Sequence, residues 1–409
     1  MNIQTTISRK LTRIPAFLRK RIYFDLFLKF KRFLLIIGDH SRPFAACFFI
    51  FLVSASTVHA GVVSLTGAEI LKLRNLVASS PDAAQWAVSI ENKAAKNLGE
   101  TPNPISNIES AGKLKGSEEK TRTQEALKDV SRLKSIEWAY VLTGQKQYQQ
   151  KAGDYLTAWA GTCQPPKNPI DGTNLETFIE TYDLIRPQMN ASDQQLVDNW
   201  LKAVIDTLFE SDKAAKDTHG NNWQAHRLKI IGMAAFVLGD QDTQQRVLDA
   251  LKALMDVNLN ADGTTYDFLE RDALHYHVYD LEPMIRLAMI YQRAQNLDLY
   301  HWKTDKGASI AQCVAFLVPY AKGEKIHPEW VHTKIQFDIQ RGLNGEKGYI
   351  SGENFDPKNS QKCLELAQFF EPNLKTLVGS LTDKLESPYP SFQVLINEVT
   401  RPTMGQPKP

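Results

Sequence analysis

Residues 270–283 of the chain read ERDALHYHVYDLEP. If this stretch is helical, Arg271, His275 and Tyr279 are spaced four apart and lie on one face, within an arc of roughly 80°. That face would carry a permanent cation, an imidazole and a phenol. The alternative is a core helix in which His275 and His277 are buried and hydrogen-bonded. A core would have to pair every one of these polar groups, so their shared face favours a functional site.

Most of the chain around this stretch shows the apolar periodicity of helices. We expect helices at residues 67–79, 120–143, 146–161, 174–186, 193–210, 222–238, 242–258, 279–295, 306–321 and 360–371. Strand-like alternation is scarce before residue 325. Short connections between such helices predict an all-α fold, either a bundle or a closed α/α toroid built from helix hairpins.

A weak internal repeat favours the toroid. Gly172-Thr173 leads through a predicted helix to Tyr182-Asp183-Leu184, and Gly263-Thr264 leads likewise to Tyr279-Asp280-Leu281. The two copies lie about 90–100 residues apart, as a repeated pair of helices could produce. We therefore expect one toroidal domain over residues 61–400.

Two glycine- and proline-rich regions interrupt the helices. Residues 98–119 are expected to form a surface loop or a lid. Residues 322–359 are expected to form a long functional loop or a short β-element. Residues 401–409 are proline-rich and are predicted to be a disordered tail.

The first 60 residues have the features of a secretory signal. Residues 1–42 are rich in Lys and Arg, residues 44–53 read FAACFFIFLV, and small residues lead to Ala60. This order predicts a leader that is cleaved off after Ala60, with the mature protein periplasmic or secreted. The apolar run is shorter than the roughly 20 residues of a membrane span, so no stable anchor is expected after cleavage. An uncleaved anchor is the alternative, and the oligomeric state stays open.

Removal of this leader reverses the net charge. The full chain holds 48 basic and 46 acidic residues, but ten of the basic and only two of the acidic ones lie in the leader. A net negative mature chain gives no reason to expect nucleic-acid binding. Three widely spaced cysteines remain, Cys163, Cys313 and Cys363, and neither these nor the histidines have metal-binding spacing. No metal or other cofactor is predicted.

A second cluster of polar residues stands at residues 219–229, which read HGNNWQAHRLK. Asn222 and His226 are four apart, so both would project from one face at the start of a helix, where anions bind favourably. The alternative is a structural role, in which Asn221 caps this helix. Trp223 is either a core residue or a platform for a sugar ring. Asn174 begins another helix and is expected to face the same cleft.

Asn221-Asn222, Arg271, the string ALHYHVY at 273–279 and LEP at 281–283 resemble the alginate lyase superfamily of polysaccharide lyases, over residues 65–370 or so. The resemblance implies an incomplete α/α toroid that cleaves uronic-acid polymers by β-elimination without a cofactor. Tyr279 aligns with the family's catalytic tyrosine. Trp223 stands where better-known members have a histidine, and His226 where they have a tryptophan. Asp272 replaces the family's arginine, with Arg271 one residue earlier, so the chain is similar to a divergent branch.

The chemistry of elimination assigns roles to these residue types. A uronate resists loss of its C5 proton until its carboxylate is neutralised, here by Asn222, Arg271 and a histidine. In a syn elimination Tyr279 would be both base and acid, helped to ionise by a neighbouring arginine. In an anti elimination His226 or His275 would be the base and Tyr279 the acid. The predicted substrate-binding residues are Asn174, Asn221, Trp223, His275, Tyr276 and His277.

The expected substrate is an anionic polysaccharide with 4-O-linked uronates, either alginate or polymannuronate, or glucuronan. Lys334, Arg341 and Tyr349 are further candidates for substrate contacts. Two other functions stay open. A toroidal glycoside hydrolase would need two carboxylates about 5–9.5 Å apart, drawn from Glu270, Asp272, Asp280 and Glu282. A non-catalytic binding protein for acidic polysaccharide would need no acid or base at all.

Overall fold

The computed structural model describes residues 61–402, and these form a helical domain. Its α-helices are α3 (Gly67–Ser79), α4 (Pro81–Asn97), α5 (Glu118–Ala126), α6 (Lys128–Thr143), α7 (Lys146–Thr162), α8 (Pro169–Gly172), α9 (Glu176–Ile185), α10 (Ala191–Ala214), α11 (Asn222–Leu238), α12 (Gln241–Asn258), α13 (Tyr266–Arg271), α14 (Leu274–Gln295), α15 (Ile310–Ala321), α16 (Gln336–Leu343), α17 (Gln361–Ala367), α18 (Lys375–Leu381) and α19 (Phe392–Thr400). Within this range the only β-pairing is two isolated bridges, Leu259 with Thr265 and Pro328 with Asn354. The all-α prediction is confirmed.

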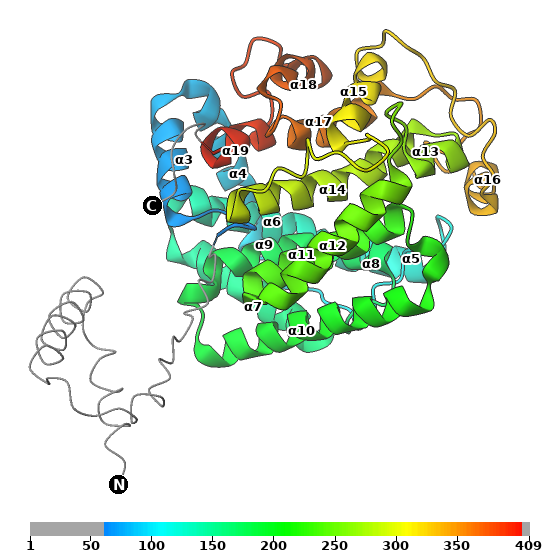
Figure 1. Cartoon of the computed structure of the whole chain (residues 1–409). Coiled ribbons are helices and arrows are strands. Elements are labelled where there is room, and N and C mark those ends of the chain that lie inside the picture. The colour runs from blue at the N-terminus through cyan, green and yellow to red at the C-terminus, as the bar shows by residue number, and fades with distance from the viewer. Residues whose placement is uncertain (1–60, 403–409) are drawn as a thin grey trace, which may run out of the picture. The chain divides into compact units, whose positions relative to one another are not determined.

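Helix α11 lies at the centre of the domain (Figure 1). All of its residues except Trp223 and Leu238 are buried, and it packs against α8, α9, α10, α12 and α14. Gly232 allows α14 to approach closely, because a Cβ at this position would lie 2.7 Å from a methyl carbon of Leu287. The side chains of the two clusters seen in the sequence are therefore carried by two helices that touch.

The helix predicted at 279–295 begins five residues earlier, and this changes the geometry of the first cluster. The backbone breaks at Asp272, which has φ 50° and ψ 47°, so Arg271 ends α13 whereas His275 and Tyr279 belong to α14. The left-handed turn is held by its surroundings. The carbonyl of Asp272 accepts from the backbone N–H of Trp330, and its carboxylate accepts from that of His332, each at 2.8 Å. The prediction of one helical face shared by Arg271, His275 and Tyr279 is wrong.

Other helices differ from the predictions in number and length. The helix expected at 120–143 is two helices, α5 and α6, which meet at Leu127. Helix α4 was not predicted, and its buried residues are small alanines (Ala83, Ala87 and Ala94). The C-terminal α16, α18 and α19 were missed as well, and each spans nine residues or fewer.

The two glycine- and proline-rich regions are mostly loops, as predicted. Residues 98–117 form a loop fixed to α8, since Asp171 accepts from the backbone N–H groups of Ser110 and Ala111 at 2.8 and 3.0 Å. Residues 322–359 form a long loop that includes α16 and one β-bridge. The predicted signal (1–60) and most of the predicted tail (401–409) lie outside the described residues.

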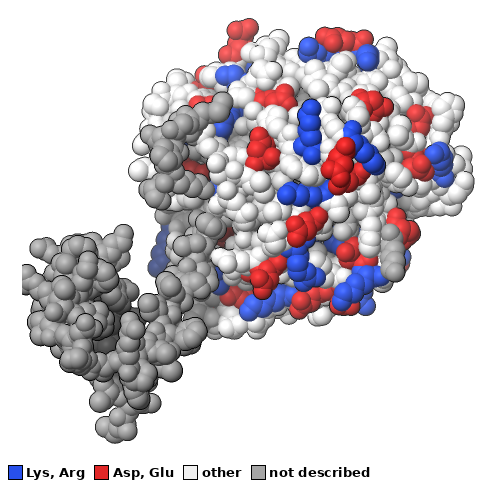
Figure 2. All heavy atoms as spheres, in the orientation of Figure 1, with Lys and Arg blue, Asp and Glu red and all other residues white. Residues whose placement is uncertain are grey.

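Acidic and basic side chains are intermixed on the face drawn in Figure 2, as the charge balance of the sequence indicates. No helix in residues 61–402 is both long enough and apolar enough to cross a membrane.

Candidate active site

The N-terminus of α11 places Asn222 against a buried carboxylate. Asp267 of α13 accepts from the backbone N–H of Asn222 and from its Nδ2, both at 2.6 Å. The other side-chain atom, Oδ1 of Asn222, is buried and has no partner among the described residues. Because a carboxylate only accepts hydrogen bonds, Asp267 fixes which way the amide faces. One Nδ2 hydrogen of Asn222 is left over for a ligand.

Asp267 also holds Arg271, which ends the same short helix. The Nε of Arg271 lies 3.4 Å from Asp267, and its Nη1 donates to Asp338 of α16 at 2.5 Å. Its guanidinium stacks over the ring of Tyr276, 3.8 Å from the ring centre. Arg271 is thus held on three sides, with its charge next to Asn222.

Tyr279 projects from α14 beside His226 of α11, with their ring centres 4.2 Å apart. The Nδ1 of His226 is hydrogen-bonded with the hydroxyl of Thr173 at 2.9 Å, whereas its Nε2 is buried and has no partner in the described structure. Burial, reinforced by the positive charge of Lys229, lowers the pKa of His226 well below 6.5. The imidazole is therefore neutral at physiological pH, and His226 is one of the residues that line a cavity described below.

Tyr279 itself is held in its phenol form. Burial raises its pKa above the ordinary value of 10.0, and Tyr276 and Glu282 add to the effect. The expected help from Arg271 is not seen, because that guanidinium lies on Tyr276 instead. A protonated phenol is suited to donate a proton rather than to remove one.

His275 lies four residues before Tyr279 and contacts the long C-terminal loop. Its Nε2 is hydrogen-bonded with the hydroxyl of Tyr349 at 3.1 Å, and Arg341 stacks on the Tyr349 ring. Burial and the nearby Arg341 lower the pKa of His275 to about 4. His275 is a second neutral imidazole on the same helix as Tyr279.

These groups line a cavity of about 580 Å³, here called the cationic cavity. Four basic side chains reach it, Lys113, Lys120, Arg271 and Arg341, and none of the described residues that line it is acidic. Its wall also includes Asn174, Asn222, Trp223, His275, Tyr276, Tyr279 and Tyr349. The structure thus brings together predicted residues from four separate parts of the chain.

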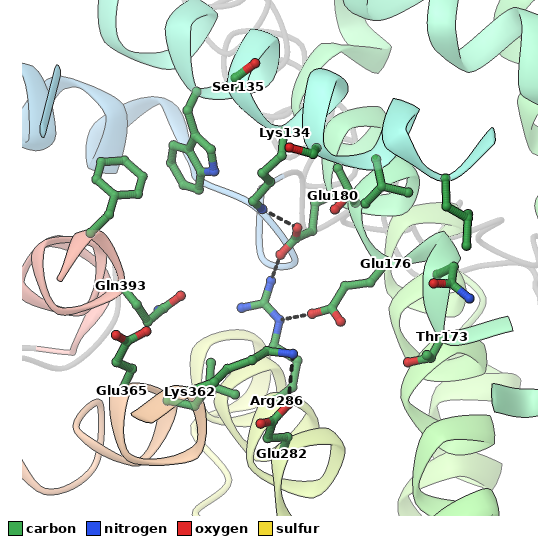
Figure 3. A pocket seen from close by; sticks show the side chains of 18 of the residues that line it. Lys134, Ser135, Thr173, Glu176, Glu180, Glu282, Arg286, Lys362, Glu365 and Gln393 are labelled. Atoms are coloured by element: carbon green, nitrogen blue, oxygen red, sulfur yellow. Dashed lines mark hydrogen bonds and ion pairs between the residues drawn. The ribbon is translucent and has the colours of Figure 1, made fainter. Parts of the chain in front are cut away.

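A second cavity of about 810 Å³ lies on the other side of Tyr279, and we call it the paired-charge cavity. Leu127, Asn174 and Tyr279 line both cavities, so the two adjoin at Tyr279. Figure 3 shows ion pairs of Lys134, Arg286 and Lys362 with glutamates that line the second cavity. Lys134 and Arg286 both contact Glu180, Arg286 and Lys229 contact Glu176, and Lys362 contacts Glu282 at 2.8 Å.

The pairing keeps the carboxylate of Glu176 charged. Burial alone would raise the pKa of Glu176, but Lys229, Lys362 and Arg286 outweigh it and lower that pKa below its usual range. Among predicted residues, His226 lines this cavity rather than the cationic one. None of the ion pairs was predicted, because their partners lie on helices far apart in sequence.

Two predicted substrate-binding residues line neither cavity. His277 is fully buried, with one ring nitrogen hydrogen-bonded to Thr265 and the other to the carbonyl of Cys313. His277 is a core histidine with both ring nitrogens hydrogen-bonded. It does not share the direction of His275, because positions two apart on a helix face different sides. Asn221 caps α11, since its side chain accepts from the N–H of Trp223 at 3.0 Å. For both, the structural alternative fits better than substrate binding.

The described residues contain no group of three or more His, Cys, Asp or Glu side chains placed to hold a metal ion. The four acids considered for a glycoside hydrolase are also dispersed. Glu270 pairs with Lys334 at the surface and Asp280 is fully buried. Only Glu282 of the four lines either cavity.

The sequence profile of the alginate lyase family matches residues 77–327. This chain belongs to the alginate lyase family. The family resemblance stated from the motifs is confirmed, and membership makes the chain a polysaccharide lyase. A comparison with curated proteins finds no significant match.

Solved structures of the family share the fold. An alginate lyase from Bacteroides ovatus is 18% identical, with a TM-score of 0.60 over 80% of this chain and 97% of its own. Alginate lyase A1-III from Sphingomonas species A1 is 16% identical, with a TM-score of 0.52 over 74% of this chain and 95% of its own. A tyrosine-to-phenylalanine variant of A1-III, complexed with a tetrasaccharide, matches at 16% identity and a TM-score of 0.52, over 65% of this chain and 80% of its own. The predicted incomplete α/α toroid is confirmed.

Proposed function

We propose that this protein cleaves an acidic polysaccharide by β-elimination at a 4-O-linked uronate, at the junction of the two cavities. One observation carries the proposal. Asn222 and Arg271, which can neutralise a carboxylate, and Tyr279, which can protonate a leaving oxygen, line the same cavity although they come from three helices. Alginate or polymannuronate is the first substrate to test, given the family, and glucuronan is the second.

The uronate carboxylate occupies the cationic cavity in this proposal. Removal of the C5 proton leaves extra negative charge on the carboxylate, and that charge must be stabilised in the transition state. Arg271 supplies a fixed cation and the free Nδ2 hydrogen of Asn222 supplies a donor. Both are held in place by Asp267 before substrate arrives, so little reorganisation is needed.

His226 takes the C5 proton and Tyr279 protonates the departing oxygen at C4. His226 is neutral and its Nε2 has no partner among the described residues, whereas the Nε2 of His275 is engaged by Tyr349. Tyr279 retains its proton because burial raises its pKa. Two groups in opposite protonation states are what an elimination with a separate base and acid requires. His275 is then a positioning residue for the uronate.

Glycoside hydrolysis is less well supported by this arrangement. A hydrolase needs one carboxyl group that is protonated and one that is free. Three carboxylates of the paired-charge cavity, Glu176, Glu180 and Glu282, are each held in an ion pair with Lys or Arg. The fourth, Glu365, accepts a hydrogen bond from the side chain of Gln361. The signal features of residues 1–60 support a periplasmic or secreted location for the proposed lyase.

The test is the ultraviolet absorbance of unsaturated sugar ends, measured on purified protein with alginate, polymannuronate and glucuronan. We expect Tyr279→Phe to lower kcat by about 10³-fold, because the removed hydroxyl is the proton donor. Circular dichroism and thermal unfolding serve as controls for folding. Full activity in this variant would show that Tyr279 takes no part in the mechanism. If the wild-type protein produces new reducing ends without ultraviolet absorbance, it is a hydrolase and not a lyase.

A further inference from the structure

Asp183 of α9 lies outside both cavities, although the sequence repeat singles it out together with Asp280. Its side chain is 6% exposed, and it binds the first residues of the described chain. The backbone N–H groups of Gly61 and Val63 donate to its two carboxylate oxygens, each at 3.1 Å. The backbone N–H and the hydroxyl of Ser64 donate as well, at 2.8 and 2.9 Å.

The turn that aims the nitrogen of Gly61 at Asp183 accepts only glycine. Gly61 has φ +86°, and a Cβ on it would lie 2.5 Å from the carbonyl oxygen of Leu65. Both the positive φ and the contact with backbone exclude a larger residue without a shift of the turn. Arg293 of α14 secures the same turn, because it donates to the carbonyls of Gly61, Val62 and Ser64. The segment is therefore built into the domain.

The cations nearest to Asp183 are shared with other carboxylates. The charged side chains that face it are Arg286 and Arg293 of α14. Arg293 pairs with Glu69 of α3 at 2.6 Å, and Arg286 pairs with Glu180 and Glu176. The described hydrogen-bond donors to the Asp183 carboxylate are neutral N–H and O–H groups. A buried carboxylate is most stable when it is matched by a positive charge.

We propose that the chain is cut between Ala60 and Gly61 and that the new α-ammonium group of Gly61 forms a buried ion pair with Asp183. Water is added across the Ala60–Gly61 peptide bond by a signal peptidase, so that Ala60 keeps a carboxylate and Gly61 gains an amine that takes up a proton. In the uncut chain the same nitrogen is a neutral amide. Processing thus completes the folded domain, independently of the lyase reaction.

Two independent features point to this bond. The sequence places small residues at Val58 and Ala60 after a basic and then an apolar segment, as signal peptidases require. The structure places the nitrogen that would be released 3.1 Å from a buried carboxylate. The docked segment also supports the paired-charge cavity, because Arg286, which lines that cavity, donates to the carbonyl of Val63.

The first part of the test is to export the full chain from a Gram-negative host and to determine the mature N-terminus by mass spectrometry and Edman sequencing. We expect Gly61 to be the first residue. A mature chain that starts elsewhere would overturn the proposal.

The second part compares this product with a chain that carries two extra residues, Gly-Ser, between Ala60 and Gly61. Cleavage then leaves a neutral amide at Gly61. We expect the extended protein to unfold about 5 °C lower at pH 6, because the buried pair is lost. Pairing with Asp183 raises the pKa of the α-amine above its usual value of about 8. The stabilisation is therefore complete below pH 8 and is lost as pH rises through the raised value.

The control is the same pair of N-termini in an Asp183→Asn background, where the two proteins should unfold at the same temperature. If Asp183→Asn does not fold, the pH dependence of the difference in the wild-type background decides. Equal unfolding temperatures for the two wild-type N-termini between pH 6 and 8 would contradict the ion pair.

Discussion

The cationic cavity and the paired-charge cavity adjoin at Tyr279 but differ in the charges of the side chains that line them. In the first, four basic side chains line the wall and none of the described lining residues is acidic. In the second, each of Lys134, Lys229, Arg286 and Lys362 is matched by a glutamate. The cations of the first cavity are paired too, but their acids, such as Asp338 and Glu346, lie behind the wall.

This difference indicates where an anionic group is stabilised. A carboxylate that enters the cationic cavity meets positive charge at the surface, whereas one that enters the other cavity displaces glutamates already in place. Attraction between opposite charges is strongest where water is excluded. The uronate under attack therefore belongs in the cationic cavity, and the neighbouring sugar across Tyr279 meets a surface of balanced charge.

The proposed difference between the two cavities is tested most directly by removing one cation from each. We expect Arg271→Met to lower kcat by about 100-fold, because a donor to the developing charge is lost. The matched change, Lys362→Met, should alter kcat less than about threefold. Lys362 is 65% exposed and pairs with Glu282 near the surface, where ion pairs contribute little. Initial rates of ultraviolet absorbance on polymannuronate measure both.

Arg271→Met also leaves Asp267 and Asp338 without their guanidinium, so folding must be checked by thermal unfolding. Arg271→Lys keeps a charge but cannot contact both acids at once, and its kcat should lie between those of the methionine variant and the wild type. If Lys362→Met lowers kcat as much as Arg271→Met does, the proposed division between the two cavities is wrong.

The pH dependence of kcat/KM sharpens the assignment of base and acid. Burial and Lys229 lower the pKa of His226 well below 6.5, so this base stays neutral, and active, until the pH falls through that lowered value. Burial raises the pKa of Tyr279 above 10.0, so this acid keeps its proton until the pH rises through that raised value. We expect a plateau that extends from below pH 6.5 to about pH 10. A fall in kcat/KM near or above pH 6.5 as the solution is acidified would argue against a buried neutral imidazole.

The smallest effect on activity is expected at His277, in contrast with His275 two residues before it. His277→Gln cannot keep the bonds to both Thr265 and the Cys313 carbonyl, so it should lower the free energy of unfolding by about 1–3 kcal/mol. Its kcat should stay within about twofold of the wild type. His275→Gln breaks the contact with Tyr349 in the cationic cavity and should lower kcat more than it lowers stability. Urea unfolding and initial rates separate the two effects, and a large loss of kcat in His277→Gln would place that residue in the mechanism after all.

Local patterns were sufficient where a feature depends on neighbours in the sequence. The periodicity of α7, α11 and α12 predicted those helices. The helical spacing gave a wrong prediction at Asp272, because the left-handed backbone there is held by the N–H groups of Trp330 and His332. Those residues are about 60 positions away, and no helical pattern in residues 266–295 contains that information.

The sequence by itself determined that the chain is helical, which residue types could perform an elimination, and which family it belongs to, since these follow from short-range spacing and from motif strings. Only the tertiary structure decided that Arg271 reaches the site from a separate helix, that His277 lies in the core, and that ion pairs line the second cavity. The physical reason is distance along the chain. Burial and charge pairing depend on side chains that meet only when α9, α11, α14 and the C-terminal loop have packed together.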